Sequence, residues 1–102
     1  MQNKVFKALG HPDRRALLAL LADGPRSAGD LAGAFDASWP TISRHLAVLK
    51  DAGLVSAERQ GTSQIYTITT SVVEDAVGAL LGIIGREDAA RITTKAELPD
   101  GA

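Results

Sequence analysis

Ser38-Trp-Pro-Thr-Ile-Ser-Arg-His-Leu-Ala-Val-Leu-Lys-Asp-Ala-Gly53 carries the strongest structural signal in this chain. Ile42, Leu46 and Leu49 recur at positions i, i+4 and i+7, so they share one face of a predicted helix. The opposite and leading face carries side chains that can hydrogen bond or stack: Ser38, Trp39, Thr41, Arg44 and His45. A helix that buries its back and presents such groups from its first turns is the shape that the DNA major groove admits.

Capping residues set the expected limits of this helix. Ser38 is a good N-cap, and Pro40 falls in the first turn, where its missing N–H costs nothing. Gly53 can end the helix in a left-handed conformation. We therefore expect one continuous helix from Ser38 to Ala52.

Three further helices are expected before it. Lys4–Leu9 has one apolar side, and Pro12 suits the opening of a second helix that stops at Asp23-Gly24-Pro25. Ser27-Ala28-Gly29-Asp30 resembles a capping box with Asp in place of Glu, which predicts the start of a third helix. Asp36-Ala37 then makes a tight connection, and two helices joined in this way form a helix-turn-helix.

The sequence period changes after Gly53. Residues 54–59 and 64–69 are rich in strand-forming residues, and turn-forming residues separate them at 60–63, which predicts a β-hairpin. Ser71 is expected to cap a last helix that is nearly apolar from Val72 to Ile84. This order predicts a mainly α fold with a small β-hairpin, a winged helix-turn-helix over residues 1–85. We expect residues 86–102 to form a flexible C-terminal tail, because they are polar and lightly charged.

The last helix is apolar on more than one face, and a chain of 102 residues has little core in which to bury it. Burial against a second copy of the chain is the simplest solution, so we expect a homodimer. The residues predicted at this interface are Val5, Phe6, Val73, Val77, Leu80 and Ile84.

Two motifs carry a family resemblance. They are Ala-Leu-Gly-His-Pro-Asp-Arg-Arg at residues 8–15, and Thr-Ile-Ser-Arg-His-Leu-Ala-Val-Leu at 41–49 with Ala-Gly-Leu-Val at 52–55. Together they resemble the opening signature and the recognition helix of the ArsR/SmtB family of bacterial transcription regulators. The resemblance covers Val5 to Ile84, and the cysteine-free chain looks most like the SdpR-type autorepressors. It implies a dimeric repressor of an operator, released by a signal such as an unknown effector or a partner protein.

We predict a DNA interface made by the recognition helix and the hairpin: Ser38, Trp39, Thr41, Ser43, Arg44, His45, Lys50, Arg59, Gln60 and Thr62. Arginine bidentate to guanine is the commonest specific contact, and Arg59 on a hairpin edge can reach phosphate or a narrow minor groove. Alternatives stay open for several members. Ser38 can act as a cap alone, Arg44 can form an exposed ion pair, and His45 can pack as a polar core residue. Trp39 can stack on DNA or pack on the neighbouring helix, and the hairpin turn can be merely solvated.

Metal sensing is known in the resembled family but finds few ligands here. The positions where the family places cysteines fall in Leu31–Phe35, which offers none, and the last helix has Glu74 and Asp75 but no histidine. We therefore predict no metal site and no cofactor. The alternative is a metal-responsive regulator with non-cysteine ligands, built from His11, Asp13 or surface carboxylates across a dimer.

Composition narrows the function classes. Apolar residues make 45% of the chain, cysteine is absent and the net charge is −1. We expect one globular cytoplasmic domain without a signal peptide or a membrane span. We also expect that the protein is not an enzyme, because no nucleophile–base pair or phosphate-binding glycine loop is evident. Phosphate contact usually supplies most DNA affinity, so the near-neutral charge favours one alternative: a winged-helix protein-interaction module without specific DNA binding.

Overall fold

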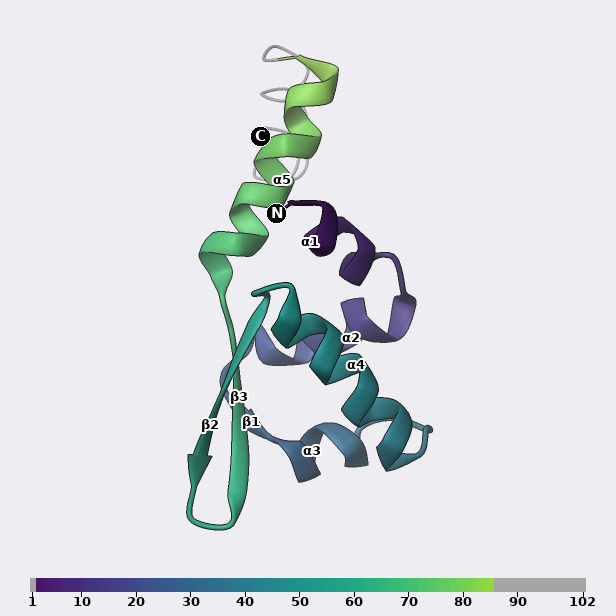
Figure 1. Cartoon of the computed structure of the whole chain (residues 1–102), viewed down its shortest axis with the longest axis vertical. Coiled ribbons are helices and arrows are strands. Elements are labelled where there is room, and N and C mark those ends of the chain that lie inside the picture. The colour runs from purple at the N-terminus through teal and green to yellow at the C-terminus, as the bar shows by residue number, and fades with distance from the viewer. Residues whose placement is uncertain (1, 86–102) are drawn as a thin grey trace, which may run out of the picture.

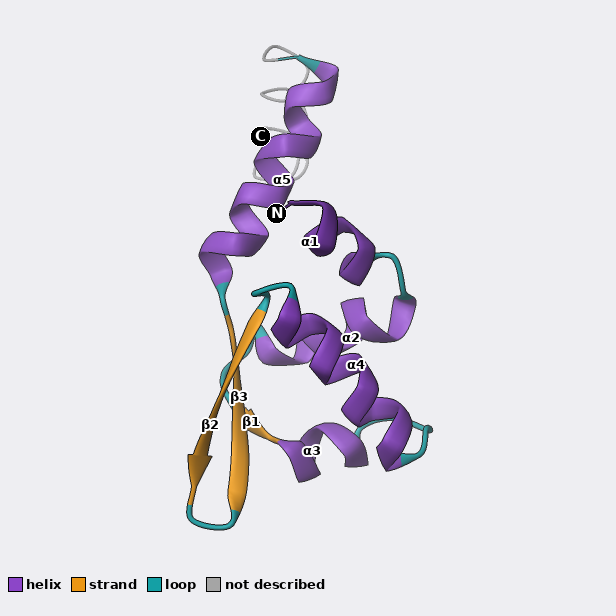
Figure 2. Cartoon of the chain, viewed as in Figure 1, coloured by secondary structure: helices purple, strands orange, loops and turns teal. Residues whose placement is uncertain are grey.

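The computed structural model describes residues 2–85, and the predicted tail at 86–102 lies outside them. Eight elements follow one another along the described chain (Figures 1 and 2): α1 (Gln2–Leu9), α2 (Pro12–Leu21), β1 (Arg26–Ser27), α3 (Ala28–Gly33), α4 (Trp39–Asp51), β2 (Val55–Gln60), β3 (Ser63–Ile68) and α5 (Thr70–Ile84). The helices and the hairpin follow the predicted order. Strand β1 is an addition to it.

Side-chain caps begin three of the helices. Backbone N–H groups donate to His11 Nδ1 (from Asp13, 3.1 Å) at α2, and to Ser27 Oγ (from Asp30, 3.0 Å) at α3. At α4, Ser38 Oγ accepts from the Thr41 N–H at 3.4 Å, which confirms the predicted N-cap. The predicted start of the last helix at Ser71 is wrong. The N-cap is Thr69, two residues earlier than predicted, and α5 begins at Thr70, because the Thr69 N–H already donates to the Leu54 carbonyl and ends the strand there.

The three strands form an antiparallel sheet in the order β1-β3-β2. In the hairpin, Val55 pairs with Ile68 and Gln60 with Ser63, so a two-residue turn remains between the strands. Gly61 in this turn has φ +63°, a conformation that glycine adopts at little cost. Strand β1 adds Arg26 opposite Tyr66 on the other edge of β3. It therefore ties the entrance of the helix-turn-helix to the hairpin.

The core lies between α2, α3, α4 and the start of the hairpin. Its largest fully buried side chains are Leu17, Leu21, Leu31, Ile42, Leu46, Leu49 and Leu54. Burial of one such side chain contributes about 1.5–3 kcal/mol, so the predicted apolar face of α4 anchors the helix on the rest of the domain. Val5 is also in this core, at 5% exposure, and Phe6 packs half-buried against it. The prediction that Val5 meets a second copy is therefore wrong, because its side chain is already covered within one chain.

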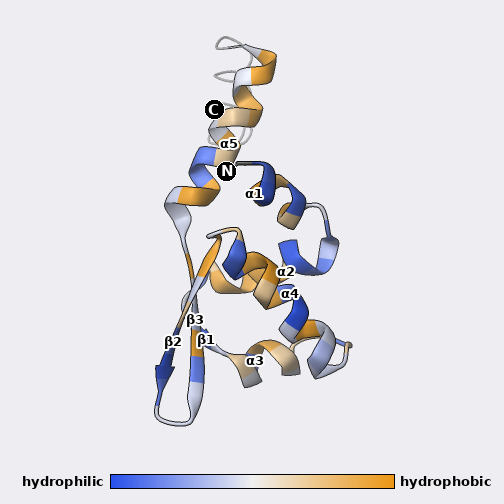
Figure 3. Cartoon of the chain, viewed as in Figure 1, coloured by the Kyte–Doolittle hydropathy of each residue, from blue (hydrophilic) through white to orange (hydrophobic). Residues whose placement is uncertain are grey.

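Helix α5 changes character along its length. Val72 and Val73 pack against the core and Ala76 is buried, but the next turns leave the helical body and run past α1 (Figure 1). Figure 3 shows apolar residues along this outer part. Val77, Leu80, Ile83 and Ile84 are 48%, 50%, 78% and 40% exposed. Within residues 2–85, no helix has both the length and the apolar character needed to cross a bilayer.

Candidate nucleic-acid interface

The amino-terminal half of α4 presents a polar outer face. Ser38, Ser43 and Arg44 are exposed, Thr41 is half-buried, and Trp39 is 46% exposed at the first helical position. The Ser38 hydroxyl also lies 3.0 Å from the Thr41 hydroxyl. Ser38 therefore acts as a cap whatever else it contacts, and Trp39 keeps nearly half of its surface open to solvent.

The hairpin supplies a second exposed group. Arg59 and Gln60 end β2 and Thr62 lies in the turn, all of them exposed. The hairpin tip and the amino-terminal end of α4 both lie at the lower end of the molecule in Figure 1. Lys50 is exposed as well, but it belongs to the last turn of α4. At 1.5 Å per residue it lies roughly 17 Å along the helix from Trp39, so the structure does not bring it together with the other predicted residues.

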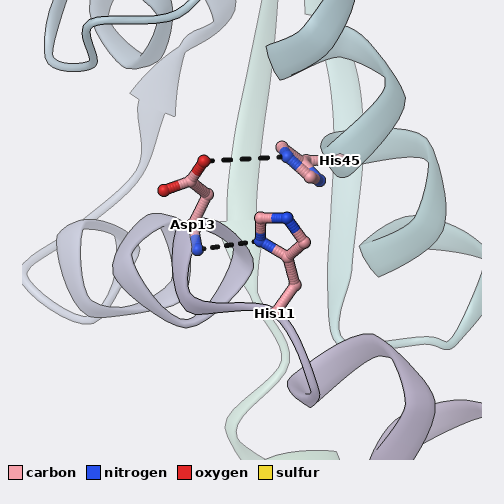
Figure 4. A group of neighbouring side chains, drawn as sticks. All are labelled: His11, Asp13 and His45. Carbon is pink, nitrogen blue, oxygen red and sulfur yellow. Dashed lines mark hydrogen bonds and ion pairs between the residues drawn. The ribbon is translucent and has the colours of Figure 1, made fainter.

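His45 does not have the exposed position that a DNA contact requires. His45 is only 9% exposed, and its ring faces α2 (Figure 4). The structure therefore favours the alternative in which His45 packs as a polar core residue over a contact with DNA. Positions 42, 45, 46 and 49 follow the spacing i, i+3, i+4 and i+7, which is the complete buried stripe of a helix, so the sequence did contain the signal.

Three groups surround the His45 ring. Arg14 Nη1 lies 3.4 Å from His45 Nδ1, Asp13 Oδ2 lies 3.9 Å from His45 Nε2, and the ring centroids of His11 and His45 are 4.4 Å apart. Burial lowers the pKa of His45, and the nearby charges of His11, Arg14 and Arg44 lower it further, against an opposing effect of Asp13. His45 is therefore neutral at pH 7, and its contact with Asp13 is not an ion pair there.

Arg14 joins this group to α1. Its guanidinium donates to the carbonyls of Ala8 (2.6 Å) and Lys7 (3.1 Å), while Arg15 donates to that of Leu9 (2.7 Å). These carbonyls lie in the last turn of α1, where the helix offers no i+4 partner, and that of Lys7 also accepts from the Gly10 N–H at 3.1 Å. Sequence reasoning missed this role. The only sequence signal for this role is the position of the two arginines, each six residues after a carbonyl at the end of α1 and just after a proline turn.

His11, Asp13 and His45 together are a set of metal-ligating types, with one ligand atom from each within 4.8 Å of the others. Their hydrogen bonds work against a metal ion. A neutral imidazole has one lone pair, and both rings already use it at Nδ1, His11 for the Asp13 N–H and His45 for Arg14. A metal would have to break the cap of α2 or the contact between α2 and α4. The arrangement favours a structural role for the cluster.

Comparison with known proteins agrees with this geometry. A profile of the family described as "Bacterial regulatory protein, arsR family" matches residues 11–57. The transcriptional repressor SdpR of Bacillus subtilis is 42% identical over 86 residues, which cover 84% of this chain and 96% of SdpR. The chain belongs to the ArsR family. The biofilm growth-associated repressor of Agrobacterium fabrum, another relative, is 34% identical over 78% of this ArsR-family chain and 68% of its own length.

Solved structures of the family share the fold. The crystal structure of an ArsR family transcriptional regulator has a TM-score of 0.70 at 35% identity, over 78% of this chain and 80% of its own. An NMR structure from Mycobacterium bovis, described as a homodimeric winged helix-turn-helix DNA-binding domain, has a TM-score of 0.67 at 37% identity, over 80% and 75% of the two chains. The predicted fold and family are thus confirmed, and so is the prediction that this ArsR-family protein is not an enzyme.

Proposed function

We propose that this chain is a transcriptional repressor that binds a two-fold symmetric DNA operator as a homodimer. The observation that carries the proposal is the division of α4. Ile42, Leu46 and Leu49 have no exposed surface, whereas the polar side of the first turns is open to solvent. A recognition helix needs this combination, because its back must be held rigidly while its first turns meet base edges.

Each exposed residue of α4 has a role in this proposal. Arg44 is the candidate for a bidentate contact with guanine, with Ser43 and Thr41 beside it for base edges or phosphate. Trp39 offers a flat apolar surface to a thymine methyl or a sugar. Ser38 meets a phosphate while it caps the helix, and Lys50 supplies charge toward the DNA backbone.

The hairpin acts as the wing. Arg59, Gln60 and Thr62 are exposed at its end, where they can follow the phosphates or enter the adjacent minor groove. Contacts of this kind position the protein on the duplex and add affinity, whereas the base contacts of α4 select the sequence.

The outer part of α5 is the proposed dimer interface. Its exposed apolar residues are Val77, Leu80 and Ile84 from the predicted set, with Ile83 beside them and Val73 half-buried at the edge. A second copy packed on this face would form a two-fold symmetric dimer. The homodimeric DNA-binding domain from Mycobacterium bovis supports this assembly. Two copies of α4 would then meet successive major grooves, about 34 Å apart, of DNA in the cytoplasm.

The net charge of −1 is the observation that favours a second candidate, a protein-interaction module that retains the fold without reading DNA. Selection of bound duplexes from a random DNA pool at low salt separates the two. The repressor proposal predicts one enriched site with two-fold symmetry. A pool without enrichment would favour the interaction module.

Once a DNA site has been selected, variants test which residue of α4 contacts its bases. Arg44→Ala should lose the enrichment or relax it at one base pair of each half-site. Lys7→Ala is the matched control, because it removes one exposed positive charge from α1, on a helix that the proposal keeps off the DNA. Equal loss in both variants would point to general electrostatics in place of base recognition.

A further inference from the structure

Four side chains connect the back of the recognition helix to the rest of the domain. His11 precedes α2, Asp13 and Arg14 lie in its first turn, and His45 lies in the middle of α4 (Figure 4). We call these four residues the histidine junction. Through Arg14 the junction reaches the last carbonyls of α1 as well, so it links three helices.

The donors in the junction fix where the protons are. A guanidinium can only donate, so His45 Nδ1 accepts from Arg14 and carries its proton on Nε2. A backbone N–H can only donate, so His11 Nδ1 accepts from Asp13 in the same way. Each contact therefore requires a neutral imidazole. A protonated ring would place an N–H against another N–H in both places.

We propose that the histidine junction positions α4 for DNA binding only while both imidazoles are neutral, so that acidification loosens the recognition helix and weakens DNA binding. A proton on His45 Nδ1 would oppose the Arg14 guanidinium, and a proton on His11 Nδ1 would remove the cap of α2. The proposal rests on the proposed function for its effect on DNA, but the loosening of α4 is a property of the protein alone.

The groups around His45 shift its pKa in the direction that the proposal requires. Burial, His11, Arg14 and Arg44 all lower its pKa, and Asp13, on α2, is the one opposing charge among the groups that act on it. A loosened or unfolded chain would hold His45 near its ordinary pKa of about 6.5 and would take up the proton first. The junction therefore stabilises the position of α4 fully above about pH 6.5, and the loosened form becomes more populated as the pH falls below that value.

Two features make the effect easy to isolate. The chain has two histidines and no cysteine, and both histidines lie in the junction. Added positive charge by itself strengthens binding to DNA phosphates. Weaker binding in acid would have the opposite sign and could not arise from net charge.

The control is a pair of asparagines. Asn at position 11 is a good N-cap and accepts from the Asp13 N–H, and the amide oxygen of Asn at position 45 can accept from Arg14. The double variant His11→Asn, His45→Asn therefore keeps both hydrogen-bond acceptors but has no side chain at these two positions that can take up a proton.

The first measurement needs no DNA. Amide hydrogen exchange, corrected for its intrinsic pH dependence, is compared at about pH 7.5 and about pH 5.5 in the wild-type protein. We expect protection in α4 to fall by up to about tenfold, the largest change that one histidine with an ordinary pKa in the open form can cause over this pH range, with less change in the β2–β3 hairpin. Unchanged protection in α4 would overturn the proposal, and because this test uses the wild-type chain, it does not depend on folding of the variant.

The second measurement is affinity for the selected duplex at the same two pH values and one salt concentration. The wild-type affinity should fall in acid by up to about tenfold, and the double asparagine variant should bind equally well at both pH values. Equal or tighter wild-type binding in acid, or an equal loss in the variant, would contradict the junction. Absence of binding at both pH values would overturn the proposed function instead, and the exchange experiment would still decide on the junction.

Discussion

Helices α4 and α5 both carry apolar stripes, yet one stripe is satisfied within the chain and the other is not. In α4, Ile42, Leu46 and Leu49 have no exposed surface. In α5, Ala76 is the single buried residue, and Leu80 and Ile83 remain at least half exposed. The comparison shows that an apolar pattern predicts burial but not the partner. The polar leading face of α4 and the bare apolar face of α5 then point to two different partners, DNA and a second copy.

The largest contrast should appear in stability. Leu46→Ala opens a cavity in a fully buried position and should lower the free energy of unfolding by about 2–5 kcal/mol. Ile83→Ala, at 78% exposure, should change the stability of an isolated chain far less. Urea unfolding of both variants at one protein concentration, each combined with Leu80→Glu so that the chain is monomeric, measures the difference. Similar losses in the two would show that the α5 face is buried in the folded unit.

Leu80→Glu should separate the dimer. It removes an apolar contact worth about 1.5–3 kcal/mol per subunit and places a charge in the proposed interface. Sedimentation equilibrium should give the mass of two chains for the wild-type protein and of one chain for the variant. Ala19→Glu on the exposed side of α2 is the control and should stay dimeric. A wild-type protein of single-chain mass at micromolar concentration would remove the basis for assigning α5 to a dimer.

Arg44→Ala tests the leading face of α4. Loss of one bidentate base contact should weaken binding to the selected site by about 1–3 kcal/mol and relax its specificity at one position. Fluorescence anisotropy with matched and substituted duplexes measures both. Affinity equal to that of Lys7→Ala for the same duplex would show that Arg44 does not read a base.

The smallest expected effect is the dependence of stability on pH. Because its surroundings lower the pKa of His45, the free energy of unfolding should decrease as the pH falls below about 6.5 and should be constant just above it. His45→Asn should flatten this slope. Urea unfolding at a series of pH values checks the direction, and an increase in stability on acidification would mean that the contact with Asp13 outweighs burial and the neighbouring positive charges.

Local sequence signals predicted most of the fold. Ser38, Ser27 and Pro12 mark helix starts that the structure confirms, because capping depends on a few adjacent residues. Strand β1 was missed since it has two residues and no period of its own, and it exists through its pairing with β3. The two-residue error at the start of α5 has the same origin, a long-range hydrogen bond from the Thr69 N–H to the Leu54 carbonyl.

The candidate site was less predictable. Exposure of Arg44, Arg59 and Trp39 followed from position on a helix or turn. The helical spacing also places His45 on the buried stripe, but its polar side chain fits a DNA interface equally well, so the sequence left both positions open. Its partners Asp13 and Arg14 come from another helix, and that meeting is set by packing, which a single sequence does not display.

Helix α4 meets DNA while α5 meets a second copy in this proposal, and native mass spectrometry of the protein on its selected duplex tests both contacts at once. We expect a complex of two chains per duplex for the wild-type protein, and loss of that complex in Leu80→Glu at the same concentration. A stable complex of one chain per duplex, unaffected by the substitution in α5, would contradict it.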